Sequence, residues 1–337
     1  MKRILVTGTA GFIGYHLAEL LLADGFQVHG YDGMTDYYDV NLKRRRHQRL
    51  LQNASFAATE AMLEDHSTLG RVAAEFQPDA IVHLAAQAGV RYSLEAPRAY
   101  VDSNVMGTLN LLEVARTLQV PHVLIASTSS VYGANTEMPF RETEKADTQL
   151  SIYAATKKAT ESMAHSYAHL FDIPITMLRF FTVYGPWGRP DLALFKFVDA
   201  ILDDRPIDIY NHGEMQRDFT FVGDLVRAMR LLIAVAPPGA DERNHGIEGD
   251  SLSPVAPFRI VNIGNSEPVR LLDFIDVIEE RLGKKAKRNY MGMQPGDVPA
   301  TWADATLLQT LTGYRPETPI AQGVAQFVDW FRDYYRK

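Results

Sequence analysis

A tyrosine and a lysine four positions apart could form a proton-transfer pair. Tyr153 and Lys157 lie in the stretch 152–171, which is rich in helix formers and contains neither proline nor glycine. On a helix, side chains four positions apart share one face, with Cβ atoms about 5–6 Å apart. A fixed ammonium beside a phenol favours the phenolate and lowers a pKa that is normally about 10. The pattern therefore predicts that Tyr153 is a general base near neutral pH.

A glycine-rich loop at the start of the chain indicates a dinucleotide site. Three glycines at positions 8, 11 and 14 follow the apolar stretch 4–6 and open a helical pattern over 15–23, and the strand pattern 27–32 then ends in an acidic residue, Asp32. In this context the glycines allow a tight turn, a close approach of pyrophosphate to backbone N–H groups, and close helix–strand packing. Asp32 would accept hydrogen bonds from a ribose 2′-hydroxyl and repel a 2′-phosphate, so NAD is favoured over NADP. The basic run 43–46 argues slightly the other way, although it is more typical of a solvated helix face.

The elements that must position these residues alternate between strand and helix. Strand patterns are expected at 80–86, 122–126 and 175–181, and a helix at 98–119. This alternation predicts an α/β fold with a parallel, doubly wound sheet, in which ligands bind at the carboxyl ends of the strands. Positions 8, 32, 85, 128 and 182 fall at or just past such ends. We therefore expect the hydroxyl run 127–130 and Tyr153 to face the same cleft as the dinucleotide.

The second half of the chain is less regular. We expect helices at 192–203, 223–235, 271–282 and 320–335 and strands at 207–210 and 258–262. The stretch 236–257 is rich in proline, glycine and charge and is expected to be a surface loop.

Composition excludes several classes of protein. The chain has 337 residues, of which 46% are hydrophobic and 22% charged, and a net charge of −7, which does not favour nucleic-acid binding. It has no cysteine, and its ten histidines show no metal-ligand spacing, so no metal site is expected. No stretch approaches 18 uninterrupted apolar residues, and we expect a cytoplasmic protein without a membrane span.

Taken together, these motifs resemble the extended short-chain dehydrogenase/reductase family, and within it the nucleotide-sugar epimerases. The resemblance covers essentially the whole chain. Its marks are the glycine loop, 84–87 (Leu-Ala-Ala-Gln), Asn104, 127–129 (Ser-Thr-Ser), Tyr153 with Lys157, and 217–219 (Arg-Asp-Phe). The segments 179–191 and 293–299 are similar to the UDP-glucuronate 4-epimerases, whereas glucose-type epimerases, decarboxylases and dehydratases usually carry asparagine where this chain has Thr182.

The resemblance implies an architecture and a set of site residues. It implies a Rossmann-type NAD-binding domain, 1–182 plus about 215–265, and a smaller C-terminal α/β domain for the UDP-sugar, about 183–214 plus 266–337. The implied cofactor-binding residues are Gly8, Gly11, Phe12, Ile13, Gly14, Asp32, Leu84, Ala85, Ala86, Gln87, Asn104, Ser127, Tyr153 and Lys157. The implied substrate-binding residues are Ser129, Ser130, Thr182, Arg189, Arg217 and Asp297. Relatives pair the helices near 98–119 and 152–171 across a two-fold axis, which implies a homodimer.

The activity implied is 4-epimerisation of UDP-glucuronate to UDP-galacturonate through a 4-keto intermediate. In that reaction Tyr153 takes the proton of the 4-hydroxyl, and Thr128 bridges the hydroxyl and Tyr153. Lys157 would hydrogen-bond the nicotinamide ribose and keep the pKa of Tyr153 low. Arg189 would grip the C6 carboxylate. One departure stands out: Met62 occupies the place where the family usually has an adenine-binding aspartate, and Asp65 lies further along. NAD could therefore bind less tightly than in relatives.

Other activities remain open from the sequence. A UDP-glucuronate decarboxylase shares the substrate and the 4-keto intermediate, and a UDP-glucose 4-epimerase shares the chemistry at C4. A 4,6-dehydratase is disfavoured because Ser129 and Ser130 stand where its carboxylates would be. A non-catalytic NAD-binding sensor is disfavoured because Tyr153 and Lys157 are both retained.

Overall fold

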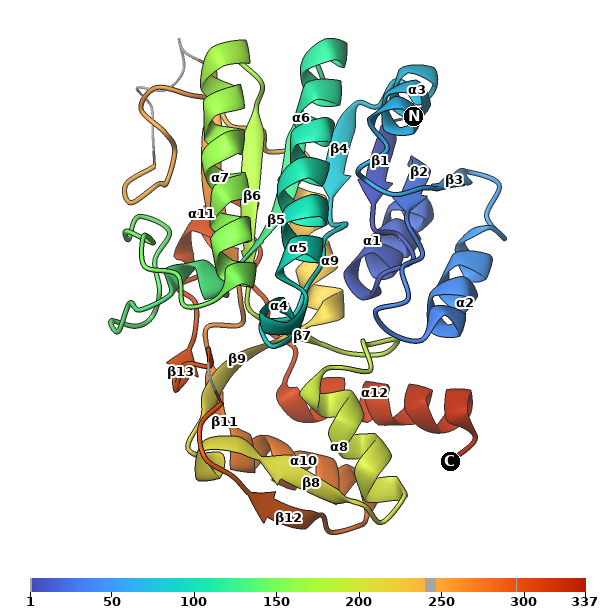
Figure 1. The fold of residues 1–337 in the computed structure, drawn as a ribbon, viewed down its shortest axis with the longest axis vertical. Coiled ribbons are helices and arrows are strands. Elements are labelled where there is room, and N and C mark those ends of the chain that lie inside the picture. Colours follow the sequence, from blue (N-terminus) through green and yellow to red (C-terminus); the bar gives the residue numbers. More distant parts are fainter. Residues whose placement is uncertain (1, 240–246, 295) are drawn as a thin grey trace.

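A seven-stranded parallel sheet runs through the larger part of the molecule (Figure 1). The computed structural model describes residues 2–239, 247–294 and 296–337; positions 240–246 of the expected 236–257 loop lie outside the described residues. The strand order is β10-β6-β5-β4-β1-β2-β3, and every pairing is parallel. These strands are β1 Arg3–Thr7, β2 Gln27–Asp32, β3 Phe56–Glu60, β4 Ala80–His83, β5 Val123–Thr128, β6 Ile175–Phe180 and β10 Phe258–Ile263.

Helices cover both faces of this sheet, as the alternation of elements predicts. Side chains along one strand point alternately to the two faces. Thus Ile4 and Val6 of β1 pack with α1, α9 and α11, whereas Leu5 packs with α3, α6 and α7. These helices are α1 Phe12–Ala23, α3 His66–Phe76, α6 Gly107–Leu118, α7 Ile152–Phe171, α9 Val222–Leu232 and α11 Thr306–Thr312. The central strands β4, β5 and β6 are buried throughout, which explains why they read as apolar runs.

The helix expected over 98–119 is present, but its type changes along its length. The structure has α4 Tyr92–Glu95, α5 Pro97–Tyr100, a π-helical segment Val101–Met106, and then α6. Within the π-helical segment Asn104 is buried and joins two elements. Its Oδ1 accepts from the Gln87 N–H at 2.8 Å, and its Nδ2 donates to the Gln87 carbonyl at 3.0 Å and to Thr156 of α7 at 3.1 Å. A π-turn inside a helix often marks a functional position.

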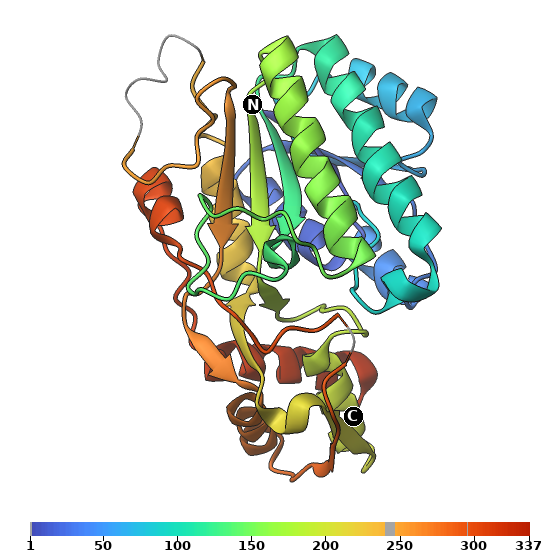
Figure 2. The ribbon, with the colours of Figure 1, turned by 60° about the vertical axis from the view of Figure 1, so that its left-hand side comes forward.

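The smaller part of the molecule lies beyond the carboxyl ends of the parallel strands (Figure 2). One small sheet has the order β11-β9-β13, with β7 also paired to β9, and β12 pairs with β8. These strands are β7 Thr182–Tyr184, β8 Pro206–Ile209, β9 Gln216–Phe221, β11 Pro268–Arg270, β12 Lys287–Tyr290 and β13 Ala300–Thr301. Three helices pack around them in a separate apolar cluster, namely α8 Ala193–Leu202, α10 Leu271–Leu282 and α12 Ile320–Tyr335.

The interpretation of the basic run 43–46 as a solvated helix face is correct for two of its residues and wrong for the other two. The run lies in α2 Val40–Leu50, where Arg44 and Arg45 are exposed, but the exposed fraction of Lys43 is 6% and that of Arg46 is 0%. A charge pattern alone does not show which side of a short helix faces the protein. Across the described ranges, no helix is both long enough and apolar enough to cross a membrane.

Candidate active site

A single cavity of about 1080 Å³ lies between the carboxyl ends of the large sheet and the smaller part. It is lined by residues of both parts. Every site residue predicted from the sequence lines this cavity except Asn104, which lies behind it and holds the backbone of Gln87. The cavity therefore brings the glycine loop, Asp32, the hydroxyl run, Tyr153 and the predicted substrate-binding side chains to one place.

The glycine loop fits the pyrophosphate of a dinucleotide. Gly8 has φ +81°, and a Cβ there would lie 2.8 Å from the Ala85 nitrogen; a Cβ on Gly14 would lie 2.0 Å from the Gly8 oxygen. Helix α1 begins after Gly11 with no side-chain cap, so its first N–H groups face the cavity without a partner from a capping side chain. Uncapped amides at a helix N-terminus attract an anion.

Asp32 is held in place at the end of β2. Its Oδ2 accepts from the Ala10 N–H and its Oδ1 from the Met34 N–H, both at 2.9 Å. Each carboxylate oxygen keeps a second lone pair for a ribose hydroxyl. Beside it, the Lys43 ammonium donates to the carbonyl and the hydroxyl of Thr35, at 2.5 and 2.9 Å. Asp32 therefore has the geometry of a ribose-binding carboxylate.

The adenine end of the cavity has no aspartate at the usual place. Met62 lines the cavity and its exposed fraction is 43%. Asp65 does not line it; Asp65 caps α3, where its carboxylate accepts from the Thr68 N–H at 3.0 Å and from Ser67 at 3.1 Å. Asp65 is thus occupied by the helix cap and does not replace the missing side chain.

The proton-transfer group is more buried than the sequence suggests. Burial raises the pKa of the Tyr153 phenol, and a hydrogen bond with Thr128 and the positive charge of Arg189 partly offset that rise. Burial also lowers the pKa of Lys157 to about 8, against the opposing effect of the Glu161 carboxylate. The sequence led us to expect a lowered pKa for Tyr153, whereas in the structure the effect of burial is larger and the pKa is raised.

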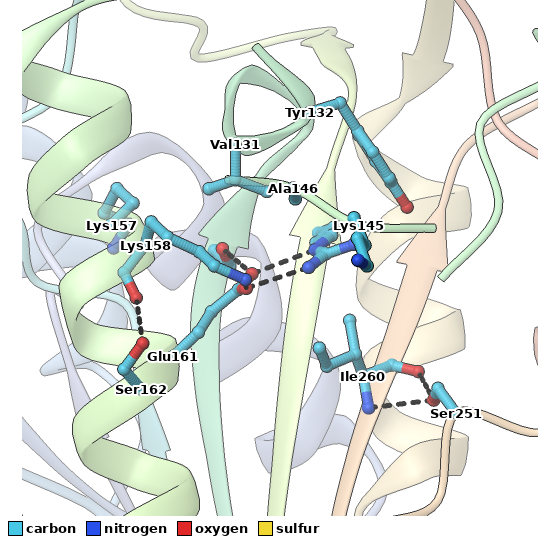
Figure 3. A network of polar contacts seen from close by, with 12 residues as sticks. Val131, Tyr132, Lys145, Ala146, Lys157, Lys158, Glu161, Ser162, Ser251 and Ile260 are labelled. Atoms are coloured by element: carbon cyan, nitrogen blue, oxygen red, sulfur yellow. Dashed lines mark hydrogen bonds and ion pairs between the residues drawn. The ribbon is translucent and has the colours of Figure 1, made fainter. Parts of the chain in front are cut away.

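Glu161, on the same helix as Lys157, belongs to a buried ion pair (Figure 3). Glu161 lies one helical turn after Lys157, and both of its oxygens accept from Arg179, at 2.9 and 2.8 Å. The Ser127 hydroxyl also donates to Glu161, at 2.7 Å. Glu161 and Arg179 are almost fully buried. Sequence reasoning missed the role of Glu161, although a carboxylate four positions after Lys157 was a visible signal.

The hydroxyl run 127–130 lines the cavity. After Thr128, residues Ser129–Tyr132 make one 3₁₀ turn, and Thr128 caps it by accepting from the Ser130 N–H at 3.1 Å. The Thr128 hydroxyl also donates to that of Ser130, at 3.2 Å. Thr128 and Tyr153 both line the cavity, and interaction with Thr128 partly offsets the effect of burial on the pKa of the phenol.

Arg189 is held by a carboxylate of its own segment. Its Nε donates to Asp191 Oδ1 at 2.9 Å and its Nη2 to Oδ2 at 2.5 Å. Tyr37 also donates to Asp191, at 3.2 Å, and so ties this segment to the loop after β2. No local pattern predicted that Asp191 and Tyr37 hold Arg189 in place.

Two further cations, Arg217 and Arg91, line the cavity. Arg217 donates to three backbone carbonyls, those of Gln216, Val298 and Pro299. Asp297 forms an ion pair with Arg91 at 3.3 Å, and the Arg91 guanidinium lies 4.3 Å from the centre of the Tyr210 ring. Arg91 and Tyr210 line the cavity and were not predicted, because nothing in the sequence brings positions 91, 210 and 297 together.

Comparison with known proteins gives consistent matches along the whole chain. The family model described as GDP-mannose 4,6 dehydratase matches residues 5–327. A probable UDP-glucuronate 4-epimerase of Rhizobium meliloti (strain 1021) is 53% identical over 335 residues, which cover 99% of this chain and 98% of that protein. UDP-glucuronate 4-epimerase 4 of Arabidopsis thaliana is 43% identical over 337 residues, which cover 98% of this chain and 76% of that protein.

A solved structure shows the same fold. The UDP-glucuronic acid 4-epimerase from Bacillus cereus, in complex with UDP-glucuronic acid and NAD, superposes with a TM-score of 0.87 at 32% identity and covers 99% of this chain and 100% of that one. The likeness confirms the predicted Rossmann-type α/β fold.

Proposed function

The chain belongs to the short-chain dehydrogenase/reductase enzymes whose family model is described as GDP-mannose 4,6 dehydratase, and from this premise we propose that it epimerises UDP-glucuronate at C4, with NAD as cofactor, to UDP-galacturonate. The observation that carries the proposal is the convergence of Tyr153, Thr128 and Arg189 on one cavity with the glycine loop and Asp32. A proton acceptor, a carboxylate-binding cation and a dinucleotide site are the three parts that this reaction needs.

The glycine loop, Asp32 and Lys157 would hold the cofactor. The uncapped N–H groups of α1 would meet the pyrophosphate, Asp32 the adenosine ribose, and Lys157 the nicotinamide ribose. Bound NAD⁺ would supply the redox chemistry of the reaction, as acceptor and then donor of a hydride at C4. Met62 leaves the adenine without an aspartate partner, which supports the idea that NAD is held less tightly here than in relatives.

Tyr153 is the base in this proposal. It accepts the proton of the 4-hydroxyl, directly or through the hydroxyl of Thr128, which lines the same cavity. Because burial raises the pKa of Tyr153, a nearby positive charge must favour its phenolate form, and Arg189 supplies one. Proton return from Tyr153 completes the inversion after the 4-keto sugar has turned in the cavity.

Arg189 is the residue that distinguishes retention of the carboxylate from its loss. The 4-keto sugar is a β-keto acid, so an unrestrained carboxylate can leave as CO₂. A planar guanidinium can bind a carboxylate through two parallel hydrogen bonds and hold it in one orientation. Thr182, Ser129 and Ser130 line the same cavity and would complete the site. This arrangement favours the epimerase over the decarboxylase.

The proposal also covers which part of the chain binds which ligand, and the oligomeric state. The ranges 1–182 with about 215–265 would bind NAD, and about 183–214 with 266–337 the UDP-sugar. A homodimer through the helices near 98–119 and 152–171 is supported by exposed apolar side chains, namely Val101 and Met106 of the π-helical segment and Leu170 of α7. A monomeric mass by light scattering at micromolar concentration would contradict it. Location in the cytoplasm remains a prediction from the sequence.

Chromatographic separation of the products formed from UDP-glucuronate tests the activity. The purified protein with NAD should convert UDP-glucuronate to UDP-galacturonate and, started from UDP-galacturonate, reach the same ratio of the two. A UDP-pentose product would identify a decarboxylase. Equal turnover of UDP-glucose would identify a less selective 4-epimerase, and no turnover of either sugar would favour an NAD-binding sensor.

A further inference from the structure

A fully buried arginine connects the two ligand-binding segments of the cavity. Arg46 of α2 has an exposed fraction of 0%. Its Nη1 donates to the Ala10 carbonyl at 2.9 Å and to the Tyr38 hydroxyl at 2.8 Å. Its Nη2 donates to the carbonyls of Trp187 and Gly188, at 2.5 and 3.4 Å. One guanidinium therefore joins three segments that are far apart in the sequence.

The partners of Arg46 are all neutral. Within the described ranges no carboxylate lies at ion-pair distance from it, and its Nε has no partner. A buried cation is normally paired, because removing a charge from water is costly. A long apolar residue would fill this position at lower cost. What only arginine supplies is a planar fork of donors that can bind carbonyl groups of two segments at once.

The backbone partners of Arg46 belong to the two proposed binding sites, one for NAD and one for the substrate. Ala10 lies between Gly8 and Gly11, and its own N–H group holds Asp32, so it belongs to the NAD side. Trp187 and Gly188 directly precede Arg189, which belongs to the substrate side. Arg46 thus fixes the segment that carries Arg189 relative to the loop that would bind pyrophosphate.

The backbone at Trp187 shows that this segment needs to be held. Trp187 has φ +58°, a left-handed backbone conformation that is unusual for a bulky residue. Its ring packs on Tyr15 of α1 and on Trp330 of α12, with ring centres 5.7 and 5.4 Å away. Its carbonyl accepts from Arg46. The strained turn that presents Arg189 is therefore held from the side chain and from the backbone.

The Tyr38 contact adds a third connection. Tyr38 stands next to Tyr37, and Tyr37 donates to Asp191, the carboxylate that holds Arg189. Arg46 thus restrains both the main chain before Arg189 and the loop that orients its partner Asp191.

We propose that Arg46 is a positioning residue that holds the Arg189 segment against the glycine loop and thereby couples NAD binding to recognition of the uronate carboxylate. The inference rests on the proposed function, since it assumes that Arg189 binds the C6 carboxylate. A ligand that fixes the glycine loop also fixes, through Arg46, the segment before Arg189. Part of the cost of ordering the substrate site is then met when NAD binds, so each ligand should raise the affinity for the other by the same factor.

Calorimetric binding to folded protein tests the coupling without relying on turnover. The parent carries Tyr153→Phe to prevent reaction, and Arg46→Met, Arg46→Lys and Arg44→Met are added to it singly. Arg44 lies on the same helix with an exposed side chain and is the matched control. For each protein, the Kd values of UDP-glucuronate and UDP-glucose are measured with and without saturating NAD, and thermal unfolding confirms that the variant is folded.

With NAD present, Arg46→Met should weaken the binding of UDP-glucuronate by roughly 10- to 150-fold, the range for loss of a hydrogen bond to a charged group. The binding of UDP-glucose should weaken much less. The factor by which NAD strengthens UDP-glucuronate binding should fall towards one. Arg46→Lys should give an intermediate loss, because its ammonium is a point donor without the planar fork. Arg44→Met should match the parent.

Two results in a folded Arg46→Met or Arg46→Lys protein would overturn the inference and leave Arg46 a structural residue. One is an equal loss of affinity for both sugars, and the other is an unchanged factor by which NAD strengthens UDP-glucuronate binding. If Arg46→Met does not fold, the Arg46→Lys result decides alone. A parent that shows no preference for UDP-glucuronate over UDP-glucose would instead contradict the proposed function. In that case the ratio of the Kd values of a UDP-sugar without and with NAD, compared between parent and variants, still tests whether Arg46 couples the two ligands.

Discussion

Replacing Arg189 by methionine should change the substrate preference of the protein. The Arg189 side chain is about four-fifths buried, and Asp191 occupies its Nε and Nη2. In the described part of the chain nothing accepts a hydrogen bond from Nη1, which leaves that edge of the guanidinium for a ligand. Arg189→Met keeps most of the side-chain volume and removes both the donors and the charge.

Two separate effects are expected from this change. Loss of the hydrogen bond to a charged carboxylate should cost about 1.5–3 kcal/mol, or roughly 10- to 150-fold in kcat/KM for UDP-glucuronate only. Loss of the positive charge should also raise the pKa of Tyr153 further, because Arg189 partly offsets the effect of burial. The second effect slows both UDP-glucuronate and UDP-glucose, and it moves the acidic limb of the pH–rate profile to higher pH.

Arg189→Lys separates the two effects because lysine retains the charge but not the planar fork. Steady-state rates with both sugars between pH 6 and pH 9 are the assay. We expect Arg189→Lys to lose selectivity for UDP-glucuronate while its acidic limb stays near that of the wild type. If Arg189→Met slows both sugars equally at every pH, Arg189 does not bind the carboxylate and the uronate assignment loses its chemical support.

Three further predictions follow from the site and its surroundings. Tyr153→Phe should reduce turnover by roughly 10²- to 10⁴-fold with little change in binding of the UDP-sugar, and a variant with more than about a tenth of wild-type activity would exclude Tyr153 as the base. Asp32→Ala should narrow the difference in affinity between NAD⁺ and NADP⁺, measured by titration; equal wild-type affinities would contradict the assignment. Burial raises the pKa of Glu142 from 4.5 to about 7, so its ionised form destabilises the folded state fully above pH 7, and this penalty disappears as the pH falls below 4.5. Glu142→Gln, which can still accept from the Asn262 N–H, should therefore gain about 3 kcal/mol relative to wild type between pH 4 and pH 8 in denaturant unfolding, whereas parallel stability curves would refute this.

Local patterns predicted the long elements and the positions of strand ends. The expected bounds 152–171, 271–282 and 320–335 agree with α7, α10 and α12, because these helices have long periodic patterns and clear ends. The short strands β9, β11 and β13 were not predicted. Strand β9 contains the buried Asp218, which accepts from the N–H groups of Asn265, Ser266 and Ala303. A carboxylate held by distant backbone is invisible to any local pattern.

The same distinction holds for the site. The glycine loop and the hydroxyl run could be predicted because each follows a strand, and the Tyr153–Lys157 pair because its spacing lies within one helix. The depth of Lys157, the Asp191 partner of Arg189 and the burial of Arg46 depend on which side chains the fold brings together. For Arg46 the local composition pointed the wrong way, since a run of four cations normally faces water.

Proton NMR of the reaction with UDP-glucuronate in D₂O tests the central claim most directly. If C4 is inverted while the carboxylate is retained, the product is UDP-galacturonate, with protium at both C4 and C5, because the C4 hydrogen leaves and returns without meeting solvent and the C5 hydrogen never leaves. A product with a deuterated C5 methylene group and no carboxylate would show decarboxylation. Deuterium at C4 would show that the hydrogen had exchanged with solvent, and either result would contradict the account.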